Sequence, residues 1–150
     1  AKFTGDGVLF LWDTRGLGPA SLGNIVINLH RVNMAYQKEW LPSVRNEFDH
    51  TPARLRCGIA RGEAFSIGNG KDFIGSCVNV ASRLQKLSQL TFAFARKGFD
   101  PKECFSKTWQ ERFIIKHTTI RGIGEHELIV VCRDEFEALP DSEKALFTDA

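Results

Sequence analysis

The stretch DFIGSCVNVASRLQKL, residues 72–87, joins the start of a strand to an amphipathic helix through Gly75. Asn79 and Arg83 are four residues apart in the helical part, so an amide and a guanidinium project together from one face. This pair is either a solvated helix flank or a pair of donors for a phosphate ester. The apolar residues that recur at helical spacing and can face a core are Cys77, Val80, Ala81, Leu84 and Leu87.

Residues 54–70 precede that helix and predict a strand followed by a tight turn. RLRCGIARGEAFSI at 54–67 alternates apolar with polar residues over its first half, which is typical of a strand, and we expect it to turn or bulge at Gly62. GNG at 68–70 is a strong turn signal. The turn leads into the element that begins at Asp72.

The first 40 residues predict a hairpin and then a helix. Residues 2–12 have an apolar strand pattern interrupted by a Gly-Asp-Gly turn at 5–7. Because the chain opens in the middle of a strand pattern, we expect a preceding N-terminal strand to be missing. A helix is predicted from Ser21 to about Trp40 and should be interrupted by Pro42. Its apolar stripe consists of Leu22, Ile25, Val26, Leu29, Val32 and Tyr36.

The C-terminal part predicts further strands and short helices. LTFAFA at 90–95 is typical of a buried strand, 105–113 of a helix, and 111–136 contains two strands joined around two glycines. DSEKALF at 141–147 predicts a short helix with Asp141 as its N-cap. This mixture predicts an α+β fold, with one mostly antiparallel sheet and helices packed on it, in a single domain over 1–150.

The composition is that of one ordinary soluble domain. The chain has 150 residues, of which 43% are hydrophobic and 25% charged, and a formal net charge of +2. So small a charge gives no support to nucleic acid or an anionic membrane as a partner. We find no signal peptide or membrane-spanning run and expect a cytoplasmic protein. The four cysteines lack zinc-like spacing and are expected to be reduced thiols: Cys57, Cys77, Cys104 and Cys132.

Several stretches, in order along the chain, resemble the catalytic domain of class III nucleotidyl cyclases, the adenylate and guanylate cyclase superfamily. The resemblance implies a ferredoxin-like, palm-type sandwich that converts a nucleoside triphosphate into a 3′,5′-cyclic nucleotide and pyrophosphate. It also implies a head-to-tail homodimer with composite active sites. The matching stretches are KFTGDGVLF at 2–10, RCGIARGEAFSIG at 56–68, DFIGSCVNVASRL at 72–84 and IRGIGEHELIVV at 120–131.

Asp6 matches one of the two aspartates that bind metal in this family. Two divalent ions, Mg²⁺ or Mn²⁺, can lower the pKa of a ribose hydroxyl and neutralise phosphate charge. The second family aspartate lies on a preceding strand that this sequence lacks, so the metal site is incomplete. On its own, Asp6 could equally be the polar residue of a Gly-Asp-Gly turn.

The resemblance also assigns roles to four other residues. Asn79 and Arg83 match the catalytic pair that orients the ribose and stabilises charge on the α-phosphate. Lys2 and Asp72 match the pair that reads the base, and in the family a lysine and an aspartate there select adenine. Donor and acceptor types alone do not exclude cytosine.

The resemblance is imperfect near residues 120–124. Family adenylate cyclases often carry two lysines there, whereas this chain has Arg121 and, in the other place, Ile123. Arg121 therefore either binds phosphate or only flanks a hairpin. Gly75-Ser76 also departs from the usual Gly-Asp or Gly-Asn.

The general residue pattern of 83–100 and 121–140, without a discrete motif, resembles that of short stand-alone bacterial cyclases. This group includes the pyrimidine cyclases of Pycsar anti-phage systems. Such enzymes make cyclic UMP or cyclic CMP, which activates a separate effector. The sequence thus favours a uridylate or cytidylate cyclase of antiviral defence. An adenylate cyclase and a non-catalytic nucleotide-binding regulatory module remain the alternatives.

Overall fold

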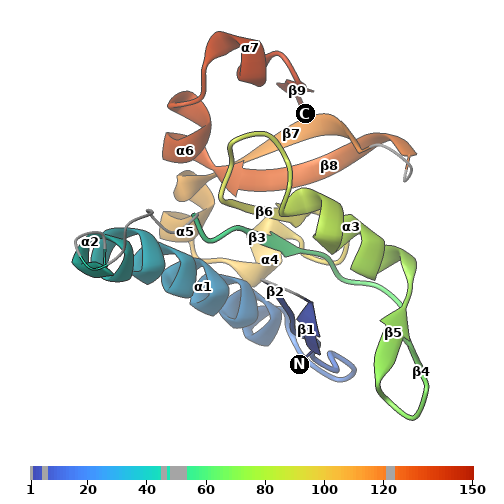
Figure 1. Cartoon of the computed structure of the whole chain (residues 1–150). Helices are drawn as coiled ribbons and strands as arrows, with labels where there is room; N and C mark the ends of the chain where they lie inside the picture. Colours follow the sequence, from blue (N-terminus) through green and yellow to red (C-terminus); the bar gives the residue numbers. More distant parts are fainter. Residues whose placement is uncertain (1, 5–6, 45–46, 48–53, 121–123) are drawn as a thin grey trace.

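A mixed five-stranded sheet forms the centre of the protein. The computed structural model describes residues 2–4, 7–44, 47, 54–120 and 124–150. The strand order is β3-β6-β8-β7-β9, with β3 parallel to β6 and the other neighbouring pairs antiparallel (Figure 1). The strands are β3 (Cys57–Ile59), β6 (Phe92–Ala95), β7 (Phe113–Ile120), β8 (Gly124–Cys132) and β9 (Phe147–Asp149).

Helices lie along and between these strands. The helical elements are α1 (Pro19–Ala35), a π-helical turn (Tyr36–Trp40), α2 (Leu41–Val44), α3 (Ser76–Leu84), α4 (Pro101–Cys104), α5 (Lys107–Arg112), α6 (Arg133–Glu137) and α7 (Asp141–Lys144). The α+β prediction is confirmed. The central sheet is mostly antiparallel, as predicted, and is mixed because β3 runs parallel to β6.

The sequence FAFA of β6 explains why helices pack on both sides of the sheet. Side chains alternate along a strand, so Phe92 and Phe94 face one side while Ala93 and Ala95 face the other. The phenylalanines pack with apolar residues of α1, and the alanines pack with those of α3 and α6. All four residues are buried, as expected of a strand covered on both faces.

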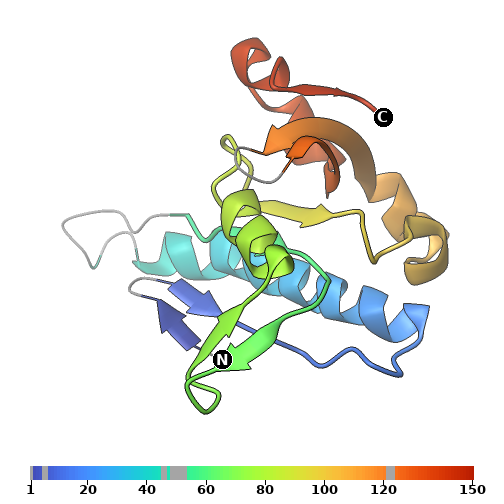
Figure 2. The ribbon, with the colours of Figure 1, turned by 90° about the vertical axis from the view of Figure 1, so that its right-hand side faces the viewer.

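Two small hairpins stand apart from the central sheet. β1 (Lys2–Thr4) pairs with β2 (Gly7–Leu9), and β4 (Phe65–Ile67) pairs with β5 (Asp72–Ile74), each pair antiparallel. Figure 2 shows the two hairpins side by side at one end of the molecule. Both hairpins were predicted from their turn signals, but as parts of one sheet; they form separate two-stranded sheets.

The predicted stripe of the first helix is wrong at Val32, which is 59% exposed. The neighbouring Asn33 is buried instead, because its amide donates hydrogen bonds to the backbone oxygens of Leu55 and Thr91. Pro42 does not interrupt the helical run as predicted. It lies within α2, directly after the π-helical turn, where the usual hydrogen-bond register is already altered.

Other element boundaries also differ from prediction. The strand expected over 54–67 stops at Ile59, and β4 is a separate strand. The helix expected over 105–113 is shorter and spans only Lys107–Arg112. Phe105 has an extended backbone and packs in the aromatic core, and Phe113 is the first residue of β7. Asp141 is the first residue of α7, and the N-cap is Pro140. Strand β9, which pairs with β7, was not predicted.

Candidate functional site

An ion pair joins the two hairpins. The Nζ atom of Lys2 on β1 lies 2.7 Å from Oδ1 of Asp72 on β5, although the residues are 70 positions apart in the sequence. Both side chains are partly exposed to solvent. The structure thus brings together the two residues that the sequence resemblance assigned to base reading.

The Asp72 carboxylate retains a free acceptor in this arrangement. Its Oδ1 accepts from Lys2 and from the backbone N–H of Phe73, at 2.9 Å for the latter. The bond from Lys2, followed by the bond from Phe73, lowers the pKa of Asp72. No described residue donates to Oδ2, so an ionised carboxylate oxygen faces outward beside a lysine ammonium.

A tight turn holds Asp72 in place. Gly68, Asn69 and Gly70 all have positive φ angles, of 60°, 56° and 79°, which explains the GNG sequence. The turn pairs Ile67 with Asp72 at the start of β5.

Helix α3 presents the amide and the guanidinium to solvent. Val80 and Leu84 are buried, whereas Asn79 and Arg83 are exposed on another face. Within the described part of the chain, neither side chain has a hydrogen bond or an ion pair. The amphipathic helix is therefore confirmed, and both donors remain available to a ligand.

Gly75 allows α3 to begin where it does. A Cβ atom at this position would lie 2.4 Å from the backbone oxygen of Glu63, closer than any side chain tolerates. The backbone N–H of Asn79 bonds to the Gly75 oxygen at 3.3 Å in the first turn. A glycine is thus required for the close approach of residues 63–64 to the helix start.

Two predicted site residues, Asp6 and Arg121, lie outside the described residues, as does Ile123. No hydrogen bond links Asn79 or Arg83 to the Lys2–Asp72 pair. Within residues 2–4, 7–44, 47, 54–120 and 124–150, no group of three or more His, Cys, Asp and Glu side chains is arranged to hold a metal ion. A completed metal site is therefore not part of the described structure.

All four cysteines are free thiols, as predicted. Burial raises the pKa of Cys57 to about 11 and, with smaller contributions from Glu135 and Asp134, that of Cys132 to about 12. Both thiols stay protonated at neutral pH. They are thus poor nucleophiles and poor metal ligands.

The two hairpins and the segment after β2 also carry exposed apolar side chains, which the sequence reasoning did not single out. Phe3 on β1 is 81% exposed and Phe65 on β4 is 60% exposed. The signal that could have found them is the apolar character of three-residue strands that have no third strand to pack on. The other large exposed apolar residues of this part are Val8, Phe10, Trp12, Ile67 and Ile74.

No family model, curated protein or solved structure matches the chain. The resemblance to class III cyclases therefore rests on the sequence motifs alone. Among the helices of the described residues, none is long and apolar enough to cross a bilayer.

Proposed function

We propose that this chain is a nucleotidyl cyclase that converts a nucleoside triphosphate into a 3′,5′-cyclic nucleotide and pyrophosphate. The observation that best supports the proposal is the 2.7 Å contact between Lys2 and Asp72. The two side chains were paired for base reading on sequence resemblance alone, and they meet across two separate hairpins.

The Lys2–Asp72 pair can hydrogen-bond a base without separating. An ammonium has three donors, and one of them is used on Asp72 Oδ1. The others, with Asp72 Oδ2, offer a donor and an acceptor side by side. Cytosine, uracil and adenine each present one donor next to one acceptor on the edge that carries their exocyclic group, so this pair alone does not choose among them.

Arg83 and Asn79 would act on the sugar and the phosphates. A guanidinium without an internal partner can donate two N–H bonds to a phosphate, and its contribution grows as negative charge develops on the α-phosphate. The Asn79 amide, one turn earlier on α3, would hold the ribose so that its 3′ oxygen faces that phosphate.

The proposal includes two divalent ions, Mg²⁺ or Mn²⁺, with Asp6 as a ligand. When bound, such ions activate the attacking hydroxyl and balance phosphate charge. The described residues do not complete this site, so no further role is derived through the ions.

A homodimer with composite sites is part of the same proposal. The hairpins that carry Lys2 and Asp72 also carry the exposed apolar residues, with Phe3 at 81% and Phe65 at 60% exposure. Contiguous apolar side chains of this size are typical of an interaction surface. A second copy that covered them would bring its own residues next to the Lys2–Asp72 pair.

The proposed substrate is UTP or CTP, and the product an antiviral signal that activates a separate effector. This preference rests on the resemblance of residues 83–100 and 121–140 to stand-alone bacterial cyclases. The alternative substrate is ATP, which the lysine–aspartate pair favours under the family rule.

The test is turnover of ATP, GTP, CTP and UTP, each with Mn²⁺ and with Mg²⁺, with cyclic product identified by mass spectrometry. We expect a cyclic pyrimidine nucleotide and an Arg83→Ala variant that is slower by about 100- to 1,000-fold. The matched control is Arg15→Ala, because Arg15 is exposed and, among the residues that the structure describes, its side chain pairs with Asp13 alone. Binding of a triphosphate with no turnover would instead favour a non-catalytic regulatory module. Turnover unaffected by Arg83→Ala would contradict the proposed mechanism.

A further inference from the structure

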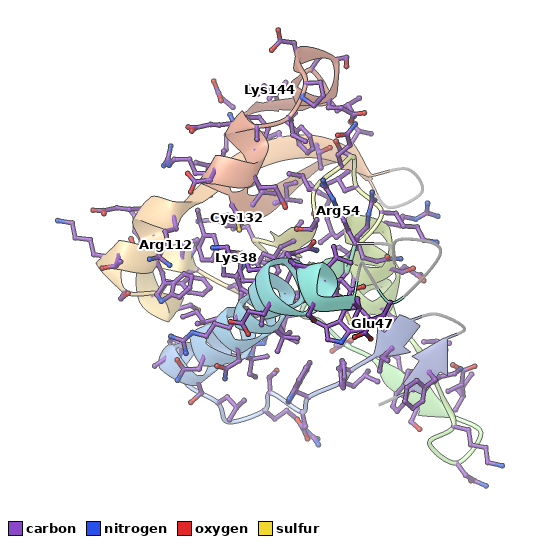
Figure 3. All side chains as sticks on the ribbon, turned by 60° about the vertical axis from the view of Figure 1, so that its left-hand side comes forward. Lys38, Glu47, Arg54, Arg112, Cys132 and Lys144 are labelled. Atoms are coloured by element: carbon purple, nitrogen blue, oxygen red, sulfur yellow. The ribbon has the colours of Figure 1, made fainter. Side chains whose placement is uncertain are left out.

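A groove that is open to solvent, with a volume of about 420 Å³, lies between α1 and α5, away from the hairpins; we call it the α1–α5 cavity. Its volume lies in the range of small-molecule sites, roughly 300–1,000 Å³. It is lined from α1 by His30, Arg31 and Met34, and from α5 by Thr108, Trp109 and Arg112. Figure 3 views this side of the molecule, with Arg112 and Lys38 labelled.

Two exposed guanidinium groups, from α1 and α5, each lie near the ring of Trp109 at this groove. The Cζ atom of Arg112 lies 4.9 Å from the Trp109 ring centroid, and that of Arg31 lies 6.0 Å from it. A cation over an aromatic face is attracted to it, yet its N–H groups remain free to donate. Neither guanidinium has a hydrogen bond or an ion pair within the described part of the chain, so two forked donors remain without an acceptor.

The surroundings do not neutralise this charge. Burial lowers the pKa of His30 at the cavity wall, and Arg112 and Lys38 lower it further, which favours an imidazole without charge. Glu135 acts in the opposite direction. Glu135 keeps its charge, but it does not line this cavity, and its carboxylate accepts hydrogen bonds from Thr91 and from the backbone N–H of Phe92.

We propose that this cavity binds a small organic phosphate. The two guanidinium groups would hold the phosphate, since their planar donors match its oxygens. The Thr108 hydroxyl would add a donor, and the apolar part of the ligand would pack against Met34 and Trp109. A cavity of this size accommodates more than a bare anion, which distinguishes an organic phosphate from inorganic phosphate. The site does not depend on the proposed cyclase activity.

The experiment uses phenyl phosphate as the probe. Inorganic phosphate and phenol are the controls, because each carries only one of the two groups of the probe. Binding to the full chain is followed by the Trp109 indole N–H resonance, assigned with Trp109→Phe, and by calorimetry. We expect saturable binding of phenyl phosphate, at least tenfold weaker binding of each control, and a shift of the Trp109 resonance. Arg31→Gln and Arg112→Gln should each weaken binding about tenfold or more.

Arg83→Gln is the matched control, because it removes an exposed guanidinium from the candidate triphosphate site instead. It should leave the phenyl phosphate affinity at the Trp109 resonance unchanged. If one arginine variant of the cavity fails to fold, the other, on a different helix, decides the result. No saturable binding, binding that survives both cavity substitutions, or binding lost only in Arg83→Gln would each overturn the proposal.

Discussion

The central sheet and the hairpin end of the molecule use the same residue types in opposite ways. Phe94 on β6 is fully buried among aromatic rings, whereas Phe3 on β1 is 81% exposed. Asn33 on α1 is buried and bonded to backbone oxygens, whereas Asn79 on α3 is exposed and has no partner in the described part of the chain. In the sheet, side chains satisfy one another. On the hairpins and on α3, apolar side chains and polar donors are instead exposed to solvent.

The largest difference should appear between Phe94→Ala and Phe3→Ala. Phe94 contacts the rings of Phe92, Phe99, Phe105 and Phe113, so its loss leaves a cavity and should cost about 3–5 kcal/mol of unfolding free energy. Phe3→Ala should cost less than about 0.5 kcal/mol in the monomer. Urea unfolding at low protein concentration measures both. Equal losses would show that the hairpin end is packed like the core and break the comparison.

Substitution of Asn33 should lower stability, whereas substitution of Asn79 should lower activity. Asn33→Ala removes two hydrogen bonds, each worth about 0.5–1.5 kcal/mol, and should cost about 1–3 kcal/mol of unfolding free energy. The two backbone oxygens keep one donor each, from Gln37 and from the backbone N–H of Cys57. Asn79→Ala should leave stability unchanged and reduce cyclase turnover. Thermal unfolding and product formation are measured on both variants. An Asn79→Ala protein with normal turnover would remove this residue from the proposed site.

A smaller effect should come from pH. Burial lowers the pKa of His30 below its ordinary value of 6.5, so the folded state binds fewer protons there than the unfolded state. The stability from the uncharged imidazole is fully present above about pH 6.5 and is lost as the pH falls through the folded pKa. Unfolding at pH 7.5 and 5.0 should therefore show a smaller acid-induced loss in His30→Gln than in the wild type. Identical losses in the two proteins would mean that His30 is not the group responsible.

The elements predicted correctly are those whose local residue pattern favours the same conformation as their packing in the fold. The GNG turn, the helix that starts after Gly75 and the strand at 92–95 are all present, because glycine chemistry and side-chain periodicity act locally there. The approach of Lys2 to Asp72 agrees with the pairing assigned by resemblance, although residues 70 apart give no local signal of contact.

The misses have tertiary causes. Asn33 is buried because two backbone oxygens on other segments accept its hydrogen bonds, and hydrophobicity alone favours its neighbour Val32. Phe105 leaves the helical conformation because the ring is required in the aromatic core. The α1–α5 cavity was not predicted, since Arg31 approaches Trp109 only through the fold.

The most direct test of the composite-site claim mixes two impaired chains. Asp6→Ala and Arg83→Ala alone should each reduce turnover about 100-fold or more, since each damages both sites of a homodimer. After subunit exchange, verified by native mass spectrometry, the mixture should recover about one quarter of the wild-type activity, because about half of the dimers are heterodimers with one intact site of two. Heterodimers that form but remain inactive would contradict the account.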